Sequence, residues 1–146
     1  MEYSFQYRSE IHEIPMIRKD MGMLEDAWNI PKSKMSQIRV IVEELFSNIV
    51  RFAYEDQLEH FIDIRLNRTD DIIEIEIIDD GIAFNPLEYC EDPLRDPAQV
   101  ESGGMGLTLV QTFSNKMSYQ RKGDKNQLRI EKKIGSNEQD RSHRKS

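Results

Sequence analysis

The stretch that decides the fold is residues 38–52, with the sequence IRVIVEELFSNIVRF. Its apolar residues recur at spacings of three and four, which is the pattern of one buried stripe on a helix. They are Ile38, Ile41, Val42, Leu45, Ile49 and Phe52. The pattern predicts a long amphipathic helix that ends before Tyr54. Ser33 is its expected N-cap, because a serine hydroxyl accepts a hydrogen bond from a free amide of the first turn.

Two polar residues of this helix, Glu44 and Asn48, are four positions apart and are therefore expected on one face. A carboxylate there can accept a proton from a hydroxyl or a water, and an amide oxygen is a hard ligand that suits Mg²⁺. The alternative is a partly solvated helix flank, which is the common outcome for an isolated pair of this kind. Glu43, one step round the helix, is expected to be an ordinary surface acid.

Alternating and helical patterns predict the other elements. A strand with one aromatic face is expected at residues 3–7, and a helix from Ile14 to about Trp28. Residues 62–66 and 73–77 alternate between apolar and polar, which predicts an antiparallel hairpin with one wet face. A third helix is expected to run to Phe113. Two last strands follow, near 117–121 and 127–134, joined by a turn at 123–126.

Composition limits the classes of function. The 146 residues carry 27 acidic against 20 basic side chains, a net charge of -7, which argues against direct binding to nucleic acid. Cys90 is the only cysteine, so no intrachain disulfide is expected. No apolar leader or membrane-spanning stretch is present in the sequence, which predicts a cytoplasmic protein. The three histidines, His12, His60 and His143, are scattered singly, so no zinc site is expected.

A second candidate segment is Asp79-Asp80-Gly81. Asp79 continues the parity of the apolar residues of its strand, so its carboxylate is expected to point toward the buried face. An inward acid needs a partner. An adenine amino group would donate a hydrogen bond to it, and Gly81 would let the backbone approach the ring. The alternative is a local turn, since Asp-Asp-Gly is a common turn sequence.

A third candidate segment, residues 103–108, carries glycines at 103, 104 and 106 at the predicted start of the third helix. Free amides and the positive end of the helix dipole favour an anion such as phosphate there. No Lys-Ser/Thr pair follows, so this is not a P-loop, and no completed dinucleotide fingerprint is present. The alternative is a hinge for the acidic loop that precedes it, from Gly81 to Ser102.

In this order, the three segments resemble the nucleotide site of the ATP-binding fold shared by gyrase, histidine kinases and mismatch-repair ATPases. Within that superfamily, the chain looks most like the small bacterial serine-protein kinases that act as anti-sigma factors. The similarity spans Tyr3 to about Ile134. Residues 42–48, 78–84 and 103–110 match the three nucleotide boxes of the family.

The fold expected from this resemblance and from the predicted elements is α+β. It is a two-layer α/β sandwich of the histidine kinase-like ATPase (Bergerat) type, with a mixed, mostly antiparallel sheet and three helices on one face. We expect one ATPase domain at residues 1–135 and a polar tail at 136–146.

The resemblance implies a role for each candidate residue. Glu44 would be the general base, Asn48 the ligand of Mg²⁺, and Asp79 the reader of adenine. The remaining contacts to ATP would come from Gly81, Gly104, Met105, Gly106, Leu107 and Thr108. Arg18 falls where such kinases use an arginine against protein partners, although a solvated helix residue is the alternative.

The resemblance also implies partners: a sigma factor, and an anti-anti-sigma protein of the STAS type whose serine would be phosphorylated. A homodimer through the exposed first strand is a further expectation. A fragment of a histidine kinase is disfavoured, because no helix-pair domain with a phosphorylatable histidine precedes the site and His12 lies too close to the start.

Two departures from the family pattern bear on chemistry. Ala83 stands where the second box usually has a glycine, and Glu101-Ser102 stands where some of these kinases have an arginine, which leaves Arg95 as the only cation of the loop. Phosphoryl transfer depends on positioning and charge stabilisation. The alternative function is therefore a nucleotide-dependent binding module without phosphotransfer.

Overall fold

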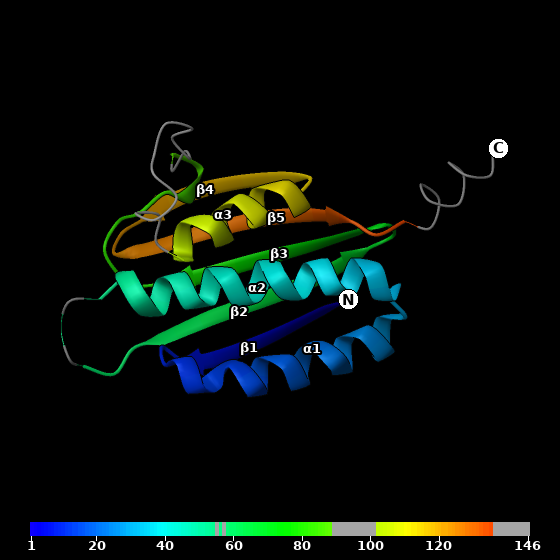
Figure 1. Ribbon diagram of the computed structural model, residues 1–146, viewed down its shortest axis with the longest axis horizontal. Helices are drawn as coiled ribbons and strands as arrows, with labels where there is room; N and C mark the ends of the chain where they lie inside the picture. The colour runs from blue at the N-terminus through cyan, green and yellow to red at the C-terminus, as the bar shows by residue number, and fades with distance from the viewer. Residues whose placement is uncertain (55, 57, 89–101, 136–146) are drawn as a thin grey trace.

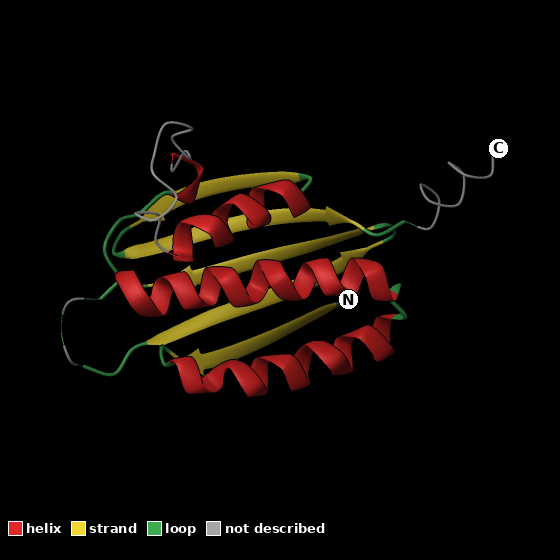
Figure 2. Ribbon diagram, in the orientation of Figure 1, coloured by secondary structure: helices red, strands yellow, loops and turns green. Residues whose placement is uncertain are grey.

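The computed structural model describes residues 1–54, 56, 58–88 and 102–135. In this part of the chain, three α-helices cover one face of a five-stranded sheet (Figures 1 and 2). The strands are β1 (Glu2–Arg8), β2 (Phe61–Thr69), β3 (Ile72–Asp79), β4 (Lys116–Lys122) and β5 (Lys125–Lys133). The helices are α1 (Ile14–Trp28), α2 (Lys32–Phe52) and α3 (Ser102–Phe113), with short 3₁₀ turns at Ile11–Glu13 and Pro86–Glu88. The predicted two-layer α+β fold is confirmed.

The strand order is β1-β2-β3-β5-β4, and all four of these pairs are antiparallel. The prediction of a mostly antiparallel sheet is confirmed, and no parallel pair occurs among the described strands. β1 and β4 are the edges. Figure 1 shows α2 lying over the centre of the sheet, between α1 on the β1 side and α3 on the β4 side. α2 therefore contacts both other helices.

The core lies between the helices and the inward face of the sheet, as the two periodicities predict. The inward residues of β2 and β3 are almost completely buried: Ile62, Ile64, Leu66, Ile73, Ile75 and Ile77. The helices contribute, among others, Ile17, Leu24, Ile38, Ile41, Val42, Leu45, Phe46 and Val110. Each such side chain stabilises the fold by about 1.5–3 kcal/mol relative to an exposed one. The aromatic face of β1 packs onto the helices, with Tyr7 edge-on to Phe46 at 6.1 Å between ring centroids.

Two boundary predictions are wrong. α2 begins at Lys32 after Pro31, so Ser33 lies inside the first turn and does not cap it. Pro31 suits the position before a helix because its ring fixes φ, here at -57°. The last turn is also shorter than expected: β5 already begins at Lys125, and Gly123 adopts a φ of 61°, which glycine tolerates without strain.

A buried lysine of β5 connects this strand to α2 and α3. Lys132 of β5 is only 5% exposed, and its Nζ donates to the carbonyl of Phe113 at the end of α3 over 2.7 Å. The same group donates to the side chain of Gln37 on α2. These bonds fix the C-terminal end of α3 against α2 and β5. No helix in the described residues is long and apolar enough to cross a bilayer.

Candidate functional site

The central helix α2 carries the first pair of predicted site residues. Glu44 and Asn48 lie one turn apart on its C-terminal half, and both are partly buried. Their neighbours Leu45 and Phe46 point into the core, so the helix is held firmly by packing. The pair therefore sits at the margin of the core, as the sequence predicts.

The start of α3 lies directly against Glu44. A Cβ added at Gly106 would stand 2.7 Å from the carboxyl carbon of Glu44, which is closer than real side chains approach. Only a glycine leaves room for this carboxylate, which explains why position 106 carries a residue without a side chain. The first and third candidate segments thus meet, although they are about sixty residues apart in sequence.

Asp79, the last residue of β3, is 6% exposed and points inward as predicted. Its Oδ1 accepts hydrogen bonds from the backbone amide of Gly81 at 2.8 Å and from Nδ2 of Asn126 at 3.0 Å. Burial raises the pKa of Asp79 above its ordinary value, and the two hydrogen bonds act in the opposite direction. The turn alternative is therefore also present in the molecule, because Asp79 caps the amide of Gly81.

Asn126 of β5 holds the whole second segment. Besides Asp79, its Nδ2 donates to the carbonyl of Ile82 at 2.8 Å. Its Oδ1 accepts from the hydroxyl of Tyr119 and from Nη1 of Arg121, the latter at 3.2 Å. The same Nη1 donates to the carbonyl of Gly81 at 2.8 Å. β4 and β5 thereby fix residues 79–82 by side-chain bonds.

Gly81 brings this second segment against the C-terminal end of α2. A Cβ at Gly81 would lie 2.6 Å from the carbonyl oxygen of Ala53, so a larger residue does not fit. The amide of Ile82 donates to that same oxygen at 2.9 Å. α2 is therefore the shared element: its middle touches the third segment and its end touches the second.

The predicted residues of the third segment divide into two groups. Gly104, Met105 and Gly106 belong to the first turns of α3, which begins at Ser102, just before the glycines where its start was predicted. Leu107 is 3% exposed and packs in the core, so its side chain is not available to a ligand. Thr108 is partly exposed. Ala83 is exposed, while Arg95 and most of the predicted acidic loop lie outside the described residues.

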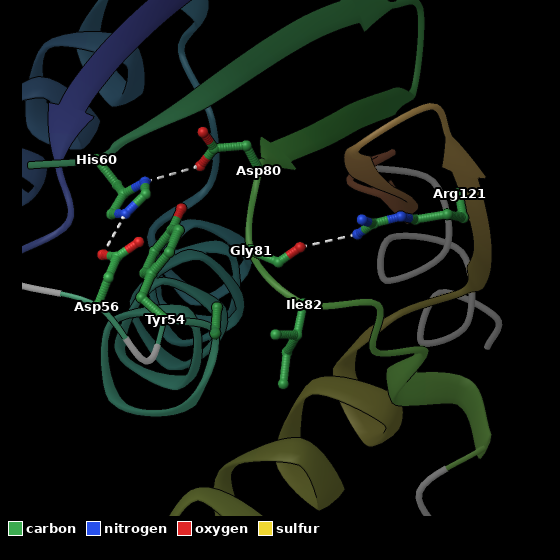
Figure 3. Close-up of a pocket in the computed structure, with 8 residues that line it drawn as sticks. Tyr54, Asp56, His60, Asp80, Gly81, Ile82 and Arg121 are labelled. Carbon is green, nitrogen blue, oxygen red and sulfur yellow. Dashed lines mark hydrogen bonds and ion pairs between the residues drawn. The ribbon is translucent and has the colours of Figure 1, made fainter. Parts of the chain in front are cut away.

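A cavity of about 470 Å³ opens beside the second segment (Figure 3). It is lined by Ala53, Tyr54, Asp56, His60, Asp80, Gly81, Ile82 and Arg121. Of the predicted site residues, only Gly81 lines it. The described cavity is thus next to the predicted nucleotide contacts and is not formed by Glu44, Asn48 or Asp79.

Arg18 of α1 is engaged by Glu43. Its Nε and Nη2 donate to the two carboxylate oxygens of Glu43, each at 3.0 Å. Glu43 is only 18% exposed, so the prediction of an ordinary surface acid is wrong. The pair raises the pKa of Arg18 above its ordinary value, chiefly through the hydrogen bonds to Glu43. Arg18 itself remains largely accessible from outside.

The described residues contain no cluster of three or more His, Cys, Asp or Glu side chains that could hold a metal. A hard cation at Asn48 would therefore need phosphate oxygens as further ligands, which is how Mg²⁺ is commonly bound with nucleotides. Gly106 lies against Glu44, and the buried Asp79 accepts from the amide of Gly81, which lies against Ala53.

Comparisons with known proteins agree with this geometry. Residues 8–132 match the model of the histidine kinase-like ATPase domain. The anti-sigma F factor of Caldanaerobacter subterraneus is 33% identical over 106 residues, 71% of this chain and 73% of that protein. A serine/threonine-protein kinase of Bordetella bronchiseptica, BtrW, is 30% identical over 94 residues, 64% of this chain and 66% of that protein.

A solved structure of the RsbU and RsbW domains of a Mycobacterium tuberculosis protein superposes with a TM-score of 0.62 over 92% of this chain and 32% of that one. At 9% identity this likeness concerns the fold alone. The chain spans about three fifths of the length of the first curated anti-sigma F factors that it matches. The chain belongs to the histidine kinase-like ATPase domain family and, within it, to the family of the anti-sigma factors.

The sequence did not predict three side chains that bond to the second segment: Asn126, Arg121 and His60. A signal existed for the first two, because they share the inward parity of Leu128 on β5 and of Tyr119 on β4. The error was to assign Asn126 to a turn. His60 had no signal, since its partners Asp56 and Asp80 come together only in the fold.

Proposed function

We propose that this chain binds ATP with Mg²⁺ and transfers the terminal phosphoryl group to a serine of an anti-anti-sigma protein of the STAS type. In the same proposal it holds a sigma factor inactive in the cytoplasm when that antagonist is phosphorylated. The observation that carries the proposal is the position of α2: its Glu44 lies against Gly106, and Ala53, the residue that caps its C-terminal end, lies against Gly81. One helix thus links the three segments expected to hold a nucleotide.

In the proposed complex, each residue acts through its own chemistry. Asn48 would offer its amide oxygen to Mg²⁺, which would neutralise the phosphates. Asp79, held in place by Asn126, would accept a hydrogen bond from the adenine amino group. The start of α3 would present amides to phosphate oxygens. Glu44 would accept the proton of the serine hydroxyl.

Calorimetric titration of ATP tests the binding part. We expect Mg²⁺-dependent binding by the wild type and a loss of the Mg²⁺ dependence in Asn48→Ala, while Asn67→Ala on the opposite face of the sheet serves as the matched control. Unaltered affinity of Asn48→Ala with and without Mg²⁺ would contradict the assigned role.

Labelled ATP and a purified STAS-type antagonist test the transfer. We expect label on a partner serine, abolished by Glu44→Gln with ATP binding spared, and unaffected by Glu74→Gln. A second candidate function, a nucleotide-dependent binding module without phosphotransfer, is favoured by Ser102 in place of an arginine. Absence of label together with intact ATP and sigma-factor binding would select it.

We also propose a homodimer, because β1 is an edge of the sheet and an edge strand can pair with a second strand. The amide of Arg8 at the end of β1 already donates to Oε2 of Glu13, so the residues before Arg8 would form the pairing. Sedimentation of the pure chain tests this, and a single monomeric species at all concentrations would refute it.

A further inference from the structure

His60 lies between the loop that follows α2 and the segment Asp79-Asp80-Gly81. His60 is the residue immediately before β2, and its backbone carbonyl accepts a hydrogen bond from the amide of Ser9 at 2.8 Å. Its ring stacks on Tyr54, which follows α2, with 3.9 Å between centroids and 14° between planes. The side chain is only 15% exposed. β1 and the end of α2 thus fix where the imidazole stands.

Both ring nitrogens of His60 face a carboxylate (Figure 3). Nε2 lies 2.8 Å from Oδ1 of Asp56, and Nδ1 lies 3.2 Å from Oδ1 of Asp80. Ionised carboxylates only accept hydrogen bonds, and a neutral imidazole carries a single N–H. The two bonds therefore exist together only when the ring is the doubly protonated imidazolium.

We infer that His60 is a positioning residue: its imidazolium clamps Asp80 to the loop after α2 and so keeps residues 79–82 in register with the helix that carries Asn48. This inference rests on the proposed function for its effect on ATP. Asp80 stands between Asp79 and Gly81, and Ile82 is already bonded to Ala53 in the same place. Without the clamp, residues 79–82 are still tied by that backbone bond, by the Asn126 bonds and by the bond from Arg121 to the carbonyl of Gly81.

The surrounding charges favour the clamped form. Asp56 and Asp80 lie on either side of the ring, and hydrogen bonding to Asp56 is the main reason why the pKa of His60 is raised, with both negative charges adding to it. The nearby cation Arg8 is paired with Glu59 at 3.0 Å, and Arg121 across the cavity is bonded to the carbonyl of Gly81. A raised histidine pKa means that the clamp is complete below the usual value and is lost as the pH rises through the raised one.

Titration of ATP with excess Mg²⁺ between pH 6.5 and pH 9 tests the inference, with His12→Gln as the control because that histidine is exposed and pairs with Glu10, outside the candidate site. Protonation of ATP itself is the same for every variant and cancels in their ratios. We expect His60→Gln to bind about three- to fivefold more weakly than His12→Gln at the lowest pH. The two should converge at the highest pH.

Asp56→Asn keeps the imidazole but removes the carboxylate that chiefly raises the pKa of His60. We therefore expect the ATP affinity of Asp56→Asn to fall to that of His60→Gln at a lower pH than the affinity of His12→Gln does. Equal affinities of His60→Gln and His12→Gln at every pH would overturn the inference.

Hydrogen exchange of the Ile82 amide gives a readout without nucleotide. Its protection, measured relative to His12→Gln at the same pH, should fall in His60→Gln at low pH. If no variant binds ATP, the proposed function fails, and unchanged Ile82 protection would then overturn the clamp as well.

Discussion

Gly106 and Glu44 are in such close contact that no other residue fits at position 106 without moving the carboxylate. The atoms that an added methyl group would meet all belong to the flexible end of the Glu44 side chain. Glu44 is thus the group that must move, while the backbones of α2 and α3 can stay in place.

Gly106→Ala is therefore expected to impair chemistry more than folding. Alanine favours a helix by about 1 kcal/mol over glycine, which offsets the rotamer cost at Glu44 of about 0.5–1.5 kcal/mol, so the free energy of unfolding should change by less than about 1 kcal/mol. If Glu44 is the general base of the proposed phosphotransfer, the transfer rate should fall by about a hundredfold, because a shift of about 1 Å in a catalytic group has that effect. Urea unfolding and a transfer assay check the two halves.

Gly22→Ala is the matched control for that change, since a Cβ there would stand 3.7 Å from the nearest atom, Nη2 of Arg39. It should stabilise the protein by roughly 0.5–1 kcal/mol without affecting transfer. A transfer rate in Gly106→Ala equal to that of Gly22→Ala would show that the position of Glu44 is immaterial.

Asn126→Ala should destabilise the protein, because it removes a donor to the buried Asp79 and a donor to the carbonyl of Ile82. Leaving buried polar groups without partners costs about 1–3 kcal/mol. Urea unfolding measures this loss. Gln127→Ala, one residue on and on the outer face of the sheet, should stay within about 0.5 kcal/mol of the wild type. Equal stabilities of the two variants would mean that water replaces the Asn126 bonds at no cost.

The fold was predictable because its signals are local. The helical stripe from Ile38 to Phe52 and the alternation around Ile64 and Ile75 depend only on spacing, and the structure keeps both. Burial of Asp79 followed from the same period of two. The contact between Glu44 and Gly106 was expected only in outline, since sequence order says nothing of how close two helices approach.

The errors arose where tertiary contacts decide. Glu43 is one step from Glu44 and has the same chemistry, yet it is drawn into an ion pair by Arg18 from a different helix. The position of His60 between two carboxylates likewise depends on the way the loop after α2 returns to the sheet. No spacing within the chain encodes either pairing.

Asp79→Asn should increase stability and decrease ATP binding. The pKa of Asp79 is raised by burial, so its ionised form is disfavoured in the folded state relative to the unfolded one. The stabilising contribution of the protonated acid is present below its unfolded pKa and is lost as the pH rises through the folded pKa. The stability advantage of Asn should therefore appear as the pH rises from about 3 through that range and stay constant up to neutral pH.

If Asp79 reads the adenine as proposed, Asp79→Asn should also lose at least about tenfold in ATP affinity, because the charged acceptor for the adenine amino group is removed. Unfolding curves at several pH values and calorimetry check the two effects. Asp63→Asn, on the outer face of β2, is the control. Undiminished ATP affinity in Asp79→Asn would exclude Asp79 as the reader of the base.

Arg18→Ala should leave the fold nearly intact and weaken binding of a partner protein. Its side chain is 64% exposed, so water screens the ion pair with Glu43 and the pair adds little to stability. Lys19→Ala, on the exposed neighbour, is the control, and binding of a purified sigma factor is the measurement.

Glu43→Gln then separates two roles of the Arg18 guanidinium. If Arg18 contacts the partner directly, releasing it from Glu43 should preserve or strengthen binding. If the ion pair only shapes α1 and α2, Glu43→Gln should weaken binding as much as Arg18→Ala does, and the assignment of Arg18 as a partner contact would be wrong.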